Sequence, residues 1–267
     1  MIKRITKIIA TLGVLIPYVA FACNTFSADL ELSSAMYFTA ADSATLSVTG
    51  DATFEKWVKA ESLVLSEEMT LIWKDDDAGT GFVYKMVIMA YDTTNDWTLF
   101  CRVNGTGGAS VGAGTIHDLG FDVGTYHHVA CTYTASSKAI RIWYDGTEVT
   151  KNKVNVANAS TITDSTGILY IGANTTPERH WDGLLDEIRI SDSVRYTGTF
   201  SVQTDDFADD ANTMALYHFN ADLTTDSAGN SNTLTNVNSV TQSATVPYAG
   251  ACAVPGIPKH PDLLIFE

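Results

Sequence analysis

Apolar and polar residues alternate along most of this 267-residue chain, in short runs that end at turn-forming residues. Strict alternation sends every second side chain to one face of a strand, which is typical of sheets that bury one face. No long stretch has the period of an amphipathic helix. The pattern predicts an all-β fold, a two-layer antiparallel β-sandwich, with strands at 36–38, 45–48, 52–58, 70–74, 82–91, 96–103, 128–133, 140–144, 147–149, 167–172 and 184–190.

The clearest local signal is a hairpin at Asp145 and Gly146. This pair lies between two alternating runs, 140–144 and 147–149. An Asp-Gly pair favours a two-residue hairpin turn because both positions require a positive φ. Residues 105–114 are rich in glycine. We expect them to form a loop, and their glycine spacing does not follow the strand-turn-helix pattern of a phosphate-binding site.

The first 22 residues are organised like an export signal. Lys3, Arg4 and Lys7 precede an apolar run at 8–22 that ends in a small-x-small sequence. This run is too short to span about 30 Å of hydrocarbon as a helix. The pattern predicts a signal peptide over residues 1–22, and the alternative is a buried N-terminal helix or strand.

The remaining chain is predicted to hold a single domain. We expect an N-terminal linker at 23–33, the sandwich at 34–246, and a Pro-rich tail at 247–267. No later segment is apolar enough to span a membrane. With the signal peptide, this organisation predicts a secreted or cell-surface protein.

Four cysteines are present. Cys23 directly follows the predicted cleavage site, where it could carry a lipid anchor. The other interpretation is a disulfide from Cys23 to Cys252, which would join the two tails in an oxidising compartment. Cys101 and Cys131 alternate in phase with apolar neighbours, so both side chains should point into the core. A disulfide between Cys101 and Cys131 and two buried free thiols both remain open.

Charge narrows the class of partner. The chain has 16 Lys and Arg against 31 Asp and Glu, and its formal net charge is −15. Affinity for nucleic acid rests on clustered basic residues. We therefore expect no nucleic-acid partner.

Five motifs follow one another in a defined order: TFEKWVK at 53–59, YHHVACTY at 126–133, IRIWYDG at 140–146, LYIGAN at 169–174 and DGLLDEIRI at 182–190. Together they resemble the laminin-G-like jelly roll of the concanavalin A-like lectin/glucanase superfamily. Lys56 stands where that family usually has an aromatic residue. It suggests either a wetter face or a side chain whose stem covers apolar surface.

A later segment at 216–230 resembles another strand and loop of the same family. It could begin a truncated second repeat. We expect it instead to close the sandwich beside residues 36–38, because too few residues follow it to build a second core.

The resemblance also implies a structural calcium ion. Family members often bind Ca²⁺ through residues that correspond here to Asp186, Asp226 and Asn230. Carboxylate and amide oxygens on loops suit this hard cation. The alternative is that Asp226 belongs to a simple turn and Asp186 is an exposed charge.

Catalysis is not expected. Glucanases of this superfamily carry Glu-x-Asp-x-x-Glu along one strand, and this chain has no such triplet. Its nearest equivalent, Asp186-Glu187, should send its two side chains to opposite faces of a strand. We therefore predict no catalytic residue, with a glycoside hydrolase as the least favoured alternative.

Sugar recognition needs an aromatic ring beside amides and carboxylates. Among the residues expected in loops, His180, Trp97 and Asp75 are predicted to lie beside the ligand, whereas Trp181 is predicted to belong to the core or its rim. The sequence thus predicts an exported, non-catalytic module that binds a glycan or an extracellular protein. The alternative is an adhesive surface scaffold without a sugar site.

Overall fold

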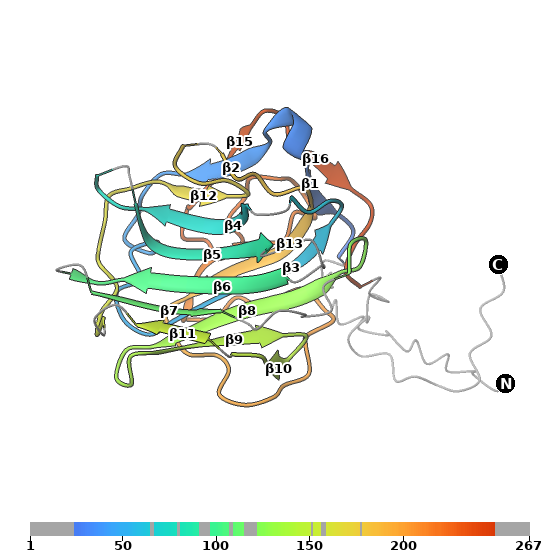
Figure 1. Ribbon diagram of the computed structural model, residues 1–267. Helices are drawn as coiled ribbons and strands as arrows, with labels where there is room; N and C mark the ends of the chain where they lie inside the picture. The colour runs from blue at the N-terminus through green and yellow to red at the C-terminus, as the bar shows by residue number, and fades with distance from the viewer. Residues whose placement is uncertain are drawn as a thin grey trace, which may run out of the picture.

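Two antiparallel sheets face each other in the computed structural model of the protein (Figure 1). It describes residues 24–64, 67–78, 81–90, 97–106, 109–114, 122–150, 152–155, 159–176 and 178–248. These residues form strands and one short 3-10 turn, Leu32–Ser34. No helix within them is long and apolar enough to cross a membrane. The predicted signal peptide, Cys23 and Cys252 lie outside the described residues.

Two long strands lie at the centre of the first sheet, which also holds most of the strands that carry the sequence motifs. Its order is β10 (Thr147–Glu148), β9 (Ala139–Tyr144), β8 (His127–Thr134), β3 (Ala52–Ala60), β13 (Gly183–Ser191), β1 (Ser27–Leu30) and β16 (Thr241–Ser243), and β14 (Thr213–Tyr217) also pairs with β13. β1 lies inside the first sheet, where it pairs with β13. Residues 27–30 therefore belong to the sandwich, and the predicted linker at 23–33 is wrong over them.

The second sheet covers the first. Its order is β11 (Asn152–Asn155), β7 (Ser110–Gly114), β6 (Trp97–Asn104), β5 (Phe82–Ala90), β4 (Glu68–Asp75), β12 (Leu169–Ile171), β2 (Tyr37–Ala40) and β15 (Thr235–Val237). Apolar side chains from the inner faces of both sheets form one core. The alternating pattern therefore predicted the sandwich correctly.

A disulfide between Cys101 and Cys131 joins the two sheets. Cys101 lies on β6 and Cys131 on β8, with their Cα atoms 6.4 Å apart. Both residues are buried in the core. The two strands belong to different sheets, so the bridge runs across the sandwich and not between neighbouring strands.

The Asp145–Gly146 hairpin has the backbone expected of its sequence. Asp145 has φ 46° and Gly146 has φ 77°, so both central residues are in the left-handed region that a type I′ turn requires. The flanking residues Tyr144 and Thr147 pair with each other.

The expected loop at 105–114 is wrong in its second half, where β7 pairs with β6. Val111 and Ala113 face the core. A Cβ on Gly112 would lie 3.2 Å from Phe100 Cζ, and one on Gly114 would lie 3.1 Å from Thr98 Cγ2. Glycine on the outer face thus lets β7 lie close beneath the side chains of β6.

Residues 45–48 do not form the expected strand. The backbone N–H groups of Leu46 and Ser47 donate to Ser43 O, and Ser43 Oγ also accepts from Leu46 N–H at 3.2 Å. A serine side chain that bonds the backbone in this way stabilises a turn. Leu46 and Val48 are nevertheless buried, which explains the apolar alternation that suggested a strand.

The late part of the chain closes the sandwich, but not in the expected pairing. Residues 216–217 belong to β14, which pairs with β13 in the first sheet. The expected residues 36–38 overlap β2, and the strand that pairs with β2 is β15. The segment nevertheless closes the sandwich beside residues 36–38 as expected, because Phe219 stacks on Phe38 with ring centroids 5.6 Å apart.

A β-bulge in β13 changes which residues face outward. Leu185 and Ile188 both belong to the core, although they are three residues apart. The pairing with β3 shifts between Asp186 and Arg189, and Glu187 has φ 49°. A bulge adds one residue to a strand, so Asp186 and Glu187 both lie on the outer face. The expectation that they face opposite sides is wrong.

Candidate ligand-binding cleft

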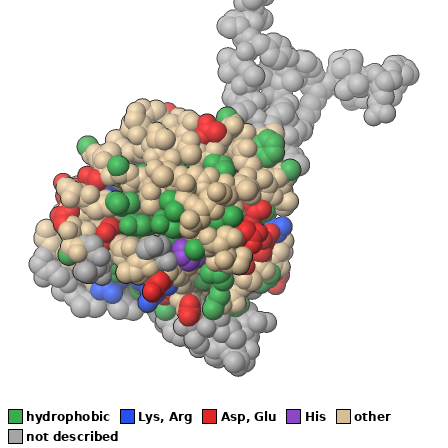
Figure 2. All heavy atoms as spheres, turned by 90° about the horizontal axis from the view of Figure 1, so that it is seen from above, with side chains coloured by type: hydrophobic (Ala, Val, Ile, Leu, Met, Phe, Trp, Pro, Cys, Tyr) green, Lys and Arg blue, Asp and Glu red, His purple; other side chains and the backbone are tan. Residues whose placement is uncertain are grey.

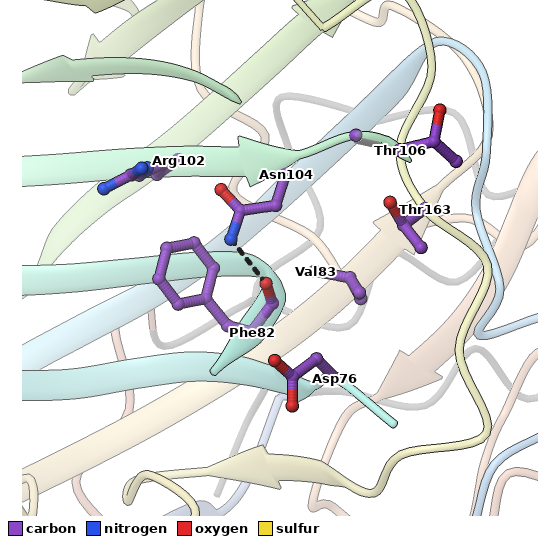
Figure 3. Close-up of a pocket in the computed structure, with 8 residues that line it drawn as sticks. Asp76, Phe82, Val83, Arg102, Asn104, Thr106 and Thr163 are labelled. Atoms are coloured by element: carbon purple, nitrogen blue, oxygen red, sulfur yellow. Dashed lines mark hydrogen bonds between the residues drawn. The ribbon is translucent and has the colours of Figure 1, made fainter. Parts of the chain in front are cut away.

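The cleft lies at the end of the second sheet where β5 begins and β6 ends (Figure 3). Its volume is about 570 Å³, within the usual range for small-molecule sites, roughly 300–1,000 Å³. Residues from two strand ends and three connecting segments line it: Asp76, Phe82, Val83, Arg102, Asn104, Gly105, Thr106 and Thr163. The tertiary structure thus brings together residues from three separate stretches of the chain.

A half-buried aromatic ring, Phe82, forms one wall. It packs edge-on against Trp73, with ring centroids 4.9 Å apart. Lys85 Nζ lies 4.9 Å from the centroid of the Phe82 ring, and the Arg102 guanidinium carbon lies 5.5 Å from it. These cation–π contacts hold the ring in place. Burial lowers the pKa of Lys85, and the nearby Glu68 carboxylate partly offsets this effect.

The polar wall has hydrogen-bonding capacity that the described residues do not use. Asn104 Nδ2 donates to Phe82 O at 2.7 Å, as Figure 3 shows, whereas Asn104 Oδ1 has no partner. Arg102 NH2 donates to Ser110 Oγ at 2.9 Å, but its Nε has none. Both atoms are themselves buried, so they are typical of positions that an ordered water completes behind the cleft wall.

Two further features complete the cleft. The Asp76 carboxylate accepts a hydrogen bond from Ala78 N–H at 3.1 Å and lies on the other side of Phe82 from Asn104 in Figure 3. At Gly105, a Cβ would lie 2.6 Å from Thr161 O. Glycine therefore lets the segment after β6 pass close to the segment that carries Thr163. The cleft combines a carboxylate, a guanidinium, an amide and hydroxyl groups beside one aromatic ring.

The structure does not bring the three predicted ligand residues together. Asp75 ends β4, next to the cleft, and is buried. Trp97 begins β6 at the opposite end of the second sheet and is only 6% exposed within the core. His180 is 7% exposed, and its ring centroid lies 5.7 Å from that of Tyr37. Only Asp75 lies next in sequence to a residue of the cleft. Trp181 is fully buried in the core.

Sequence reasoning missed Phe82, Arg102 and Asn104 because they lie at or near the ends of two strands and none forms a motif. One signal becomes visible only with the strand register. Lys85 and Arg102 are directly paired across β5 and β6, and like charges in such a pair are normally unfavourable. Here both cations stack on the Phe82 ring, so the like-charged pair lies directly against the wall of the cleft.

A second cleft, of about 560 Å³, lies at the other end of β5. Its walls are Glu67, Glu68, Met89, Glu178 and Arg179. Glu68 receives ion pairs from both Lys85 and Arg179. Among the described residues its walls hold no aromatic side chain, and Glu68 and Arg179 pair with each other, so it is the weaker candidate.

The predicted calcium ligands have other partners. Asp226 Oδ1 accepts from the N–H groups of Leu216 and Ala228, and Asp226 Oδ2 accepts from Asn232 N and Nδ2, all at 3.0 Å. Asn230 Nδ2 donates to the carbonyl of Thr213 at 3.0 Å. These bonds anchor the 226–232 loop to β14 without a cation.

Asp186 is fully buried and accepts from Asn24 Nδ2 at 2.8 Å. Burial and then the Glu187 charge raise its pKa well above the usual value. Within the described residues, Asp186 and Asp226 make no hydrogen bond to a common partner. A calcium ion held by Asp186, Asp226 and Asn230 stays a prediction.

A family model for the concanavalin A-like lectin/glucanases superfamily, of laminin-G type, matches residues 32–197. The chain belongs to this family. The match spans β2 to β13 and includes all five motifs. No sequence of a curated protein matches this laminin-G-like chain.

Solved structures show the same fold. A protein from Bacteroides ovatus ATCC 8483, provisionally described as carbohydrate binding, has 15% identity and a TM-score of 0.57, over 82% of the laminin-G-like chain and 59% of its own. The laminin-G-like chain therefore spans little more than half of that protein. The native heptameric SAP-like pentraxin of Limulus polyphemus has 8% identity and a TM-score of 0.51, over 86% of this chain and 98% of its own. At such identities the likeness establishes the fold alone.

Proposed function

We propose that this laminin-G-like domain is a non-catalytic module that binds a glycan in the cleft lined by Phe82, Arg102 and Asn104. The observation that carries the proposal is one half-buried aromatic ring that lines a cleft together with a guanidinium, a carboxylate, an amide and hydroxyl groups. Sugars are recognised by an aromatic ring under their apolar face and by planar polar groups around their hydroxyls. The provisional description of the Bacteroides ovatus protein agrees with this proposal.

The other charged groups fit the same proposal. The adjacent carboxylates Asp186 and Glu187 are fully buried, so a polysaccharide cannot lie between them as a glycosidase requires. Figure 2 shows several groups of acidic side chains on the face in view and only a few scattered basic ones. We propose an extracellular glycan as partner, reached through export by the predicted signal peptide.

The test is a glycan array with the purified chain, with and without a chelator, followed by calorimetry on the sugar that binds. Arg102→Met and Asn104→Ala should each weaken binding at least about 10-fold, because they remove contacts at the centre of the site. The matched control is Arg179→Met in the second cleft, which should bind like wild type.

Three outcomes contradict the proposal. If the array shows no bound sugar in either condition, the domain is not a glycan-binding module. If Arg179→Met loses affinity while Arg102→Met keeps it, the sugar occupies the other cleft. If the purified chain shortens the polysaccharide that it binds, the domain is an enzyme.

A further inference from the structure

Three potential metal ligands converge on the outer face of the first sheet, away from the cleft of the second sheet. They are Glu187 in β13, Asp206 in the segment between β13 and β14, and His218 just after β14. One donor atom of each lies within 4.8 Å of the others. Glu187 is fully buried, while Asp206 and His218 are partly exposed. An ion could therefore reach the group from solvent.

The backbone at Glu187 is held in an unfavourable conformation. Its φ of 49° is rare for a residue other than glycine and costs about 1–3 kcal/mol. Contacts on both sides retain it: Phe207 N–H donates to Glu187 Oε2 at 2.6 Å, and His218 Nδ1 lies 2.8 Å from Glu187 Oε1. Strain of this kind concentrates at functional sites.

An independent observation is the side chain of Asn24. It is only 5% exposed, and its Nδ2 donates to Asp186 Oδ2 at 2.8 Å, beside Glu187. Its Oδ1 is buried without a hydrogen-bond partner, and so is Asp206 Oδ1. A buried oxygen without a donor is costly. A cation that reached either oxygen would satisfy it.

We infer that Glu187, Asp206 and His218 bind a divalent first-row transition-metal ion. Imidazole nitrogen suits Zn²⁺ and its neighbours, whereas Mg²⁺ and Ca²⁺ prefer oxygen alone. Metal–ligand bonds of roughly 2.0–2.2 Å place two donors at most about 4.4 Å apart. Two donors on one tetrahedral ion lie about 3.3–3.6 Å apart, so Glu187 Oε1 and His218 Nδ1, now 2.8 Å apart, need to separate by less than an ångström.

The site would tie separate parts of the chain together. Glu187 lies in β13, Asp206 in the segment between β13 and β14, and His218 just after β14. An ion bound to all three would therefore fix β14 and the segment before it against β13.

The experiment uses the tag-free full chain, stripped with a chelator and titrated by calorimetry with Zn²⁺, Mn²⁺, Ca²⁺ and Mg²⁺. We expect about one Zn²⁺ or Mn²⁺ per chain and weaker binding of Ca²⁺ and Mg²⁺. Asp206→Asn and His218→Asn should each reduce the affinity at least about 10-fold. The matched control is Asp29→Asn, from the more exposed acidic group Asp29, Glu31 and Glu61, which should leave this affinity unchanged.

The inference is wrong if the stripped chain binds neither Zn²⁺ nor Mn²⁺, or if it prefers Ca²⁺. It is also wrong if Asp206→Asn and His218→Asn bind like wild type, or if Asp29→Asn removes the site. Should a variant fail to fold, Co²⁺ added to the wild-type chain decides. Visible absorption bands of nitrogen- and oxygen-ligated Co²⁺ support the site, and their absence overturns it.

Discussion

Lys56 is the residue that departs most clearly from its surroundings. It lies on the inner face of β3, between Phe54 and Val58, which both belong to the core. Its side chain is fully buried, and Nζ has no hydrogen-bond partner. Burial lowers the pKa of Lys56 well below the usual value. The resemblance suggested a wetter face or a stem that covers apolar surface, but the amine itself does not reach water.

Lys56→Met should therefore stabilise the domain. Methionine keeps most of the volume and removes a buried polar atom without a partner, a gain of about 1–3 kcal/mol. Urea unfolding measures it. The matched control on the same strand is Lys59→Met, where the side chain is partly exposed and Nζ lies 5.9 Å from the Tyr126 ring centroid. An equal or smaller gain for Lys56→Met than for this control would refute the argument.

At the scale of elements, a buried charge network joins three neighbouring strands. Glu55 on β3 accepts from Arg189 Nε on β13 at 2.8 Å and lies 3.2 Å from His128 Nε2 on β8. Glu55 is fully buried. Burial raises its pKa, but hydrogen bonding to His128 and the Arg189 charge outweigh this and lower it to about 2. The motif residues of these strands thus meet as one ionic network on the outer face.

Glu55→Gln should lower the unfolding free energy by about 3–5 kcal/mol at pH 7, because it leaves Arg189 buried without its charge partner. The folded-state pKa of Glu55 lies below the reference value of 4.5. Its stabilisation is therefore present above about pH 4.5 and is lost as the pH falls toward 2. Chemical unfolding between pH 7 and 2 should show a shallower acid loss in Glu55→Gln than in wild type. Parallel curves would contradict this account.

At the scale of the whole molecule, the two sheets are held by the shared core and by the Cys101–Cys131 bridge. The two cysteines are 30 residues apart in sequence. A cross-link over this distance restricts the unfolded chain far more than the folded sandwich. The proposed glycan cleft lies on the second sheet and the proposed metal site on the first, so the bridge connects the sheets that carry them.

Replacing both cysteines by alanine should lower the unfolding free energy by about 3–4 kcal/mol, from the loop that the bridge closes. Denaturant unfolding of the oxidised wild-type and double-variant chains measures the difference. A reductant should bring the wild type toward the variant and leave the variant unchanged. Equal stability of the oxidised wild type and the variant would show that the bridge does not contribute.

Local patterns along the chain determined the fold. Alternation predicted most strands, Asp145-Gly146 predicted the hairpin, and the ordered motifs predicted the family, because each depends on neighbours in sequence. Only the tertiary structure decided the sites. The β13 bulge turned Glu187 outward beside Asp186. The glycines of β7, which have no Cβ, allowed an unexpected strand. Strand register brought Phe82, Arg102 and Asn104 to one cleft. These arrangements depend on contacts between residues far apart in sequence, which no local pattern specifies.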